Sequence, residues 1–247
     1  MHKTVKALIL REVRNKEADR ILNVLSEEGK LILKAPGALK KNSKTAAGTQ
    51  ALVYSELTLY ESLGKWNVKE AVSLEDFKGL REDITALSLG SYFAEALEVF
   101  SQEDIPDSGL LRLGLNSLYA LSNGLYSQEH IKAAFEMRCM CLNGYMPDIG
   151  KCAYCGKEEP ESPFFSYENG KICCRRCRDA AFGLYADACR ESLAALRYIC
   201  GAPDKNFLKF SVSEEAQARL SNICERWFLY NTDKNFPTLE YWKKIKI

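Results

Sequence analysis

The sequence is poor in the residue patterns on which most enzymes depend. It contains only two histidines, His2 and His130, and it lacks the glycine-rich motifs that bind nucleotide phosphates and the G-x-S-x-G motif of many hydrolases. Its carboxylates are scattered over predicted helices, where charged side chains usually face solvent. These absences argue against an enzyme, and we expect no catalytic residues.

Long apolar runs and a strong net charge are also missing. No stretch approaches the roughly 20 apolar residues that a membrane-spanning helix needs, and residues 1–11 lack the apolar run of a signal peptide. The net charge is only +1, so affinity for an acidic partner must come from local clusters of charge. We therefore expect a cytoplasmic protein that has neither a membrane partner nor a small-molecule substrate.

Cysteine, by contrast, is abundant, with ten residues in the chain. Four of them form two C-x-x-C pairs that are separated by 18 residues: Cys152 with Cys155, and Cys174 with Cys177. Each pair places two thiolates on one turn, and two such turns can surround a Zn²⁺ ion tetrahedrally. The alternative is that the pairs are simply buried or disulfide-bonded. We expect one structural Zn²⁺ per chain and six free cysteines in a reducing compartment.

The residues next to the second pair leave two questions open. Cys173 is a rival ligand to Cys174, but the C-x-x-C spacing favours Cys174 with Cys177, so Cys173 should pack in the interior. The flanking Arg175, Arg176 and Arg178 are either solvated or form a small phosphate-binding patch. Because four protein ligands leave no open metal position, the site should stabilise the fold, and a zinc-dependent enzyme is disfavoured.

Residues 1–75 show the alternating pattern of β-strands. Apolar residues alternate with polar ones near Val5–Ile9, and Gly29 lies in a predicted hairpin turn. Five short strands without an intervening helix predict a small barrel, of which the oligonucleotide-binding (OB) fold is the commonest case. The strands are expected around residues 5–9, 21–25, 31–33, 52–60 and 66–72.

From about Asp76 the period becomes helical. We expect an α+β multidomain protein with an N-terminal five-stranded OB-fold barrel, followed by a helical domain that carries a four-cysteine zinc-knuckle insertion. The predicted helices cover residues 80–97, 111–121, 128–143, 187–200 and 213–230. The predicted divisions are a barrel at 1–75, a first helical part at 76–150, the knuckle segment at 151–178 and a second helical part at 179–247.

Positive charge is concentrated in the barrel segment. The first 50 residues hold eleven Lys and Arg against five Asp and Glu, which gives this segment a charge of +6 and the rest −5. Four lysines without an acidic neighbour lie in residues 34–44, and such a basic loop on a barrel is typical of a site that tracks a nucleic-acid backbone. An ordinary solvated loop is the alternative. The candidate phosphate contacts are Lys34, Lys40, Lys41 and Lys44.

Two weaker candidates accompany this loop. A second basic set surrounds the first turn between strands, although acidic residues dilute it; it consists of Arg11, Arg14, Lys16 and Arg20. Three aromatic residues at strand spacing could stack on bases, but such residues more often belong to a core. These are Tyr54, Tyr60 and Trp66.

Three segments in order resemble the RecO family of bacterial recombinational-repair proteins. Residues 4–44 (TVKALILREVRNKEADRILNVLSEEGKLILKAPGALKKNSK) are similar to its first OB strands and basic loop, and residues 57–75 (LTLYESLGKWNVKEAVSLE) to its last strands. The third segment is the pair of cysteine knuckles, CAYCG and FSYENGKICCRRC. One departure is Leu39, which stands where the family commonly has Arg or Lys.

The resemblance implies a mediator that makes and breaks no covalent bond. Such a protein would bind single- and double-stranded DNA, anneal complementary strands and, with RecR, help to load the RecA recombinase onto DNA coated by SSB. The acidic tail of SSB would need an apolar pocket ringed by basic residues, for which the helical domain is the natural place. The bacterial nucleoid is the implied location. The alternative is a zinc-stabilised protein-interaction adaptor with only incidental DNA affinity.

Overall fold

Five strands close into a barrel in a computed structural model that describes residues 2–15, 17–181 and 183–246. The order around the barrel is β1-β2-β3-β5-β4, and β3 meets β5 in a parallel pairing of Lys34 with Asn67. The predicted barrel is therefore confirmed. The strands are β1 (His2–Asn15), β2 (Asp19–Ser26), β3 (Gly29–Ala35), β4 (Tyr54–Ser62) and β5 (Lys65–Glu75).

The alternating apolar residues point into the barrel and form its core. Every second residue of β1 and β2 contributes, because successive side chains on a strand face opposite sides. Gly29 adopts a φ of +105° in the β2–β3 hairpin, and a Cβ there would lie 2.4 Å from the carbonyl oxygen of Ile105. The core consists of Val5, Ala7, Ile9, Leu22, Val24, Leu31, Leu33, Ala35, Ala38, Leu57, Leu59 and Val68.

The contacts divide the chain into two compact units, Met1–Leu125 with Phe236–Ile247, and Tyr126–Asn235. β5 ends at Glu75, and the division of the chain at 75, 150 and 178 stays a prediction. No helix in the described part of the chain is long and apolar enough to cross a membrane. Besides the barrel, the first unit contains a short 3-10 helix (Ala47–Thr49) and the helices α1 (Gly79–Glu82), α2 (Ile84–Phe100), α3 (Ser108–Ser122) and α8 (Pro237–Ile245).

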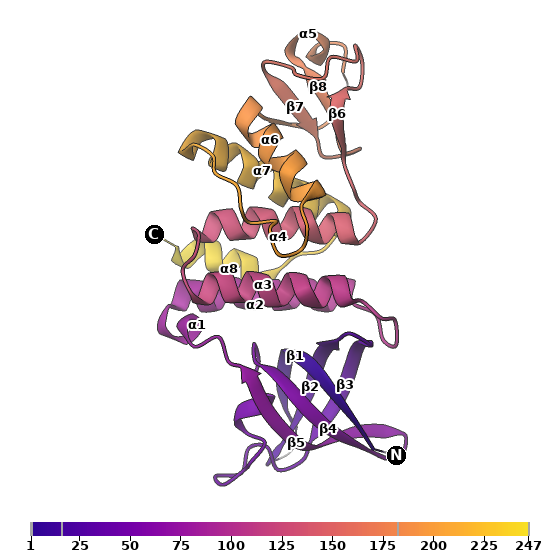
Figure 1. The fold of residues 1–247 in the computed structure, drawn as a ribbon, viewed down its shortest axis with the longest axis vertical. Coiled ribbons are helices and arrows are strands. Elements are labelled where there is room, and N and C mark those ends of the chain that lie inside the picture. The colour runs from indigo at the N-terminus through magenta and orange to yellow at the C-terminus, as the bar shows by residue number, and fades with distance from the viewer. Residues whose placement is uncertain (1, 16, 182, 247) are drawn as a thin grey trace. The chain divides into compact units, whose positions relative to one another are not determined.

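Helix α8 returns to the first unit from the far end of the sequence. It lies against α2, as its yellow ribbon shows in Figure 1. The ring of Phe236 meets Tyr92 edge-on at 5.6 Å, and the hydroxyl of Thr238 donates a hydrogen bond to Glu95. No pattern in the sequence indicated this return.

The second unit combines helices with a small sheet. The helices α4 and α6 pack on α7, in agreement with the predicted helical segments. Trp227 of α7 meets the ring of Phe165 edge-on at 5.6 Å and so ties the sheet to the helices. The sheet order is β6-β8-β7-β9. The elements are α4 (Gln128–Leu142), β6 (Asp148–Cys152), β7 (Pro163–Ser166), β8 (Lys171–Cys174), α5 (Arg175–Arg178), β9 (Tyr185–Asp187), α6 (Arg190–Gly201) and α7 (Glu214–Thr232).

Helix α4 carries a buried cation in this unit. The ammonium of Lys132, whose side chain is 3% exposed, lies 2.7 Å from the carboxylate of Glu136 and 2.8 Å from that of Glu225 on α7. Burial acts to lower the pKa of Lys132, but the two carboxylates outweigh it and raise the pKa. The charged group is therefore tolerated inside the helix layer because it is paired twice.

Candidate metal centre and nucleic-acid interface

The two cysteine pairs converge at the edge of the small sheet. Cys152 ends β6, Cys174 ends β8, and Cys177 follows on α5. The four sulfur atoms lie within 4.8 Å of one another, and those of Cys155 and Cys174 are 3.7 Å apart. A tetrahedral zinc site with Zn–S bonds of about 2.3 Å needs sulfur–sulfur separations of about 3.8 Å. The four cysteines are thus positioned to bind a metal ion, as their spacing predicted.

Backbone hydrogen bonds build the turn that carries the first pair. Gly156 adopts a φ of +71° and donates its N–H to the carbonyl of Cys152 at 3.0 Å. The N–H of Cys152 in turn donates to the carbonyl of Lys157 at 2.8 Å. Glycine is favoured at this position because it adopts positive φ without steric cost. The turn thereby points both thiols of the first pair toward the second pair.

The thiols of the cluster differ in acidity. Burial acts to raise the pKa of Cys152, but N–H groups of the neighbouring backbone, including those of Cys155 and Cys174, outweigh burial and lower it to about 6. The hydrogen bond that Cys177 makes to Cys174 raises the pKa of Cys177 to about 12. Cys152 is therefore ready to bind a cation at neutral pH, whereas Cys177 must release a proton when metal binds.

Cys173 takes no part in this cluster. Its side chain is fully buried and packs with Ala181 in the core of the small sheet. Burial raises the pKa of its thiol to about 11. In the described part of the chain, the four clustered cysteines are the one group of three or more metal-binding side chains.

The basic loop leaves three of its four predicted lysines exposed. Lys40, Lys41 and Lys44 make no ion pair with any described residue, whereas the ammonium of Lys34 lies 2.9 Å from the carboxylate of Asp19. The other oxygen of Asp19 accepts the N–H of Gly37 at 2.8 Å, so the loop is anchored to β2. The exposed lysines therefore lie on a loop whose first residues are fixed to β2 by Asp19.

Turns shape the loop beyond this anchor. The N–H of Lys40 donates to the carbonyl of Gly37 at 3.1 Å, and that of Ser43 donates to the carbonyl of Lys40 at 3.0 Å. Both hydrogen bonds span three residues, as in β-turns. The turns hold the lysine-bearing backbone in a defined path.

The second basic set is largely engaged within the protein. Arg11 pairs with Glu98 at 2.8 Å, and Arg20 pairs with Glu12 at 2.9 Å. Arg20 also donates to the carbonyl of Ala46 at 2.8 Å, at the end of the basic loop. Arg14 is exposed and donates a 3.4 Å hydrogen bond to the carbonyl of Glu17. Lys16 lies outside the described residues. The strand arginines therefore do not form one continuous free surface.

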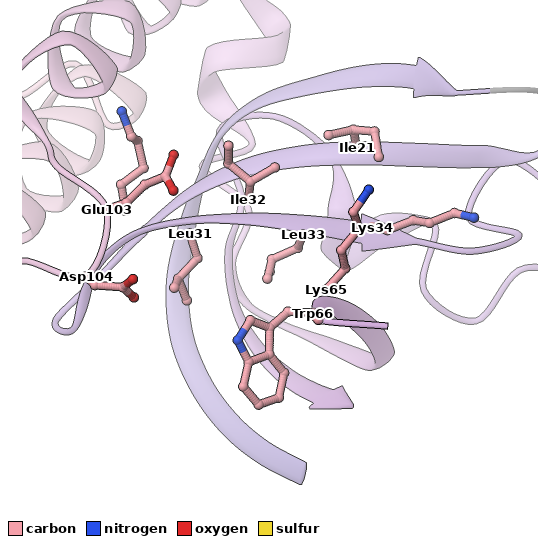
Figure 2. A pocket seen from close by; sticks show the side chains of 11 residues that line it. Ile21, Leu31, Ile32, Leu33, Lys34, Lys65, Trp66, Glu103 and Asp104 are labelled. Atoms are coloured by element: carbon pink, nitrogen blue, oxygen red, sulfur yellow. The ribbon is translucent and has the colours of Figure 1, made fainter. Parts of the chain in front are cut away.

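Sequence reasoning missed a groove on the barrel. It has a volume of about 450 Å³ and lies beside β3, next to the β4–β5 hairpin (Figure 2). Of the three aromatic candidates, Trp66 lines the groove, and it lies there with Lys65 and Lys34. The only signal in the sequence was the Lys-Trp pair at 65–66, which has no distinctive spacing.

Comparison with known proteins gives a consistent assignment. A family model described as Recombination protein O N terminal matches residues 1–74, and one described as Recombination protein O C terminal matches residues 81–240.

Individual relatives match over nearly their whole length. The chain is 32% identical over 239 residues to the DNA repair protein RecO of Acetivibrio thermocellus, which covers 96% of this chain and 95% of that protein. It is 30% identical to the RecO of Heliobacterium modesticaldum, with 93% and 85% covered, and 26% identical to that of Clostridium novyi, with 98% and 93% covered. The chain therefore belongs to the RecO family of DNA repair proteins.

Proposed function

We propose that this chain is a mediator of DNA repair and recombination, without enzymatic activity, that binds single- and double-stranded DNA and anneals complementary strands. Together with RecR, it would help to load the RecA recombinase onto DNA coated by SSB. The observation that carries the DNA-binding part is the exposed set of Lys40, Lys41 and Lys44 on an anchored loop of the barrel. The family assignment supports the rest.

Phosphate binding explains how such a surface promotes annealing. Two complementary strands repel each other, and lysines that neutralise their phosphates reduce this repulsion without reading base edges. Lys34 and Arg14 add charge near the loop. Arg11 and Arg20 reach phosphate only by leaving their carboxylate partners, and Arg20 serves mainly to hold the loop end at Ala46.

The four-cysteine cluster is proposed to hold one structural Zn²⁺. The donor set fits this ion, because four thiolates match its preference for soft ligands and leave no coordination position for a substrate. When bound, the metal supplies a cross-link between β6, β8 and α5. The chain's own contribution is to hold the four thiols close together and to keep Cys152 deprotonated near neutral pH.

Partner contacts complete the proposal. RecR and the acidic C-terminal tail of SSB are the proposed protein partners, and the nucleoid in the bacterial cytoplasm is the proposed place of action. The proposed domains are a nucleic-acid-binding barrel at 1–75, helical parts at 76–150 and 179–247, and the zinc segment at 151–178.

Reversal of two loop charges tests the DNA-binding proposal. In the double variant Lys40→Glu/Lys41→Glu, the affinity for a labelled oligonucleotide should fall at low salt. The slope of log affinity against log salt should shrink by about 1.4, because each lost contact with single-stranded phosphate removes about 0.7. Fluorescence anisotropy across a salt series measures both quantities.

A matched control carries the same change of charge elsewhere. Lys205→Glu/Lys234→Glu alters two exposed lysines of the second unit and should leave the slope unchanged. Equal effects of the two double variants would mean that only net charge matters and would remove the loop from the site. If the unaltered protein fails to bind DNA even at low salt, the adaptor alternative gains weight.

A further inference from the structure

The barrel groove lies beside the shortest strand pairing of the closed barrel, the one between β3 and β5. In the described part of the chain, β3 pairs with β5 only at Lys34 and Asn67, and at its other end Lys30 is bridged to Glu103. The groove lies alongside the stretch of β3 between these two positions. Figure 2 shows Leu31 and Leu33 on one side and the indole of Trp66 on the other. The groove thus exposes part of the indole of Trp66 and the side chain of Ile32 to solvent, whereas Leu31 and Leu33 are buried in the barrel core.

Trp66 is held firmly while part of its ring stays accessible. The indole is half-buried and packs against the barrel core. The ammonium of Lys3 lies 5.0 Å from the ring centroid, and Lys3 pairs with Glu28 at 2.8 Å. A fixed aromatic ring costs little conformational entropy when a planar ligand stacks on it, so the ring is suited to bind a base.

The groove is electrically polar along its length. Lys34 and Lys65 lie at one end, and Glu103 and Asp104 lie at the opposite end (Figure 2). Lys30 also lines the groove, next to Glu103, and its ammonium donates a hydrogen bond to the carbonyl of Glu98 at 3.4 Å. Lys65 is exposed and has no ion pair with a described residue, whereas part of the charge of Lys34 is offset by Asp19. The two acidic residues are also exposed. A ligand that fits this pattern has an anionic end, a flat apolar middle and a hydrogen-bond donor at its far end.

We propose that the groove binds one unstacked base of a single DNA strand, with the base on Trp66, its phosphate at Lys34 and Lys65, and its amino group toward Glu103 and Asp104. The volume of about 450 Å³ is within the range of about 300–1,000 Å³ of small-ligand sites. The inference rests on the proposed DNA-binding function. It adds a preference for strand form and for base type.

The preference for strand form follows from the need for a free base. A base in a duplex is paired and stacked on both faces, so it enters the groove only after unpairing, which costs a few kcal/mol. The lysines of the basic loop meet phosphates in either form of DNA. The groove therefore makes binding selective for single strands, and the loop does not.

The preference for base type follows from the acidic end. Carboxylates accept hydrogen bonds from the exocyclic amino group of cytosine, whereas thymine has no amino group. Oligo(dC) should therefore bind more tightly than oligo(dT). The variant Glu103→Gln/Asp104→Asn should reduce this difference, because neutral amides accept hydrogen bonds less strongly.

The central test compares Trp66→Ala with Trp66→Phe in the full chain. Loss of one stacked base should weaken oligo(dC) binding by about 5- to 150-fold in the alanine variant. Duplex binding and the salt slope should stay within about twofold of the parent, and phenylalanine should restore most of the single-strand affinity. An unchanged single-strand affinity in Trp66→Ala would overturn the proposal, as would an equal loss for both forms of DNA.

A measurement on the unaltered protein keeps the test independent of folding. An oligo(dC) that contains 5-iododeoxycytidine, which keeps the exocyclic amino group, should cross-link to Trp66 under ultraviolet light, with the site mapped by mass spectrometry. Cross-links confined to the basic loop would overturn the groove proposal while leaving DNA binding intact. Absence of any salt-dependent binding would instead overturn the proposed function, on which this inference depends.

Discussion

The barrel and the small sheet are both built from short strands, but they are stabilised differently. The barrel encloses a continuous core of buried apolar side chains contributed by all five strands. The buried cluster beside β6 and β8 consists of Cys152, Cys173, Cys174 and Ala181, and two of these belong to the metal cluster. A strand pattern alone therefore does not tell whether a sheet is stabilised by its own apolar core or by a bound ligand.

The positively charged side chains of the two regions also differ in whether they are bound within the protein or exposed to solvent. Around the small sheet, Arg178 lies over the rings of Tyr185 and Phe164, at 4.4 and 5.7 Å, and donates to the carbonyl of Ala181. Arg197 donates to the carbonyl of Ile149 at 3.0 Å. These arginines hold the segment together, whereas Lys40, Lys41 and Lys44 of the barrel loop leave their charge available to a partner.

Removal of the metal ligands should produce the largest difference between the two sheets. In Cys155→Ser/Cys177→Ser, metal binding should be lost together with an apparent contribution of about 10–16 kcal/mol, which is typical of structural zinc sites. Hydrogen exchange should then show unprotected amides in β6–β9 and an unchanged barrel. Cys173→Ala is the control and should keep one metal ion per chain. Full protection of β6–β9 in metal-free protein would contradict the comparison.

The helix layer of the second unit should depend on a paired charge. Lys132→Met leaves Glu136, which is fully buried, without its cation and should destabilise the unit by about 3–5 kcal/mol. Urea unfolding measures this loss. The double variant Lys132→Met/Glu136→Leu should regain most of it, because an apolar pair replaces the buried charges. If the two losses simply add, the pairing is not the cause.

A destabilising substitution in the barrel core should leave metal binding by the four cysteines unchanged. Leu22→Ala removes a fully buried side chain and should cost about 2–5 kcal/mol. Metal content and the protection of β6–β9 should not change. A loss of bound metal in this variant would mean that the two sheets are not stabilised independently.

A pH effect should be the smallest and should be confined to the second unit. His130 stacks between Tyr126 and Phe210, and its Nε2 lies 3.0 Å from the carbonyl oxygen of Leu208. Burial lowers its pKa, and the carbonyl, which favours the charged form, offsets this only in part. The folded state thus binds the proton less well than the unfolded state. Stability is therefore complete above about pH 6.5 and decreases as the pH falls below that value.

The variant His130→Phe isolates this contribution. It retains an aromatic ring between Tyr126 and Phe210 but cannot titrate. Thermal unfolding of the second unit should lose its dependence on pH between about 6.5 and 5. An equal dependence in the variant would assign the effect to other groups.

The sequence predicted features that depend on local patterns. Alternation identified the barrel strands, Gly29 marked a hairpin, and the spacing of the cysteine pairs indicated which thiols converge. The predicted segments at 187–200 and 213–230 correspond to helices α6 and α7.

Features that depend on distant partners escaped prediction. Three features join residues that are far apart in the sequence and share no helical or strand periodicity. They are the pairing of Lys132 with Glu225, the hydrogen bond from Arg20 to Ala46 and the groove at Trp66. Helix α8 was missed although Pro237 at its start and Lys243 and Lys244 in its last turn are helix signals; the sequence does not show that it packs on α2. The charge of a side chain is visible in a sequence, but its availability depends on such partners.

The return of α8 also has a consequence for biosynthesis. The ribosome releases residues 126–235 before residues 236–247, although the latter belong to the first unit. Translation proceeds at about 5–20 residues per second, so Phe236 and Thr238 are synthesised on the order of ten seconds after Tyr92 and Glu95, which they contact. During that interval an apolar face of α2 is uncovered, so a nascent chain stalled before residue 236 should be a substrate for chaperones.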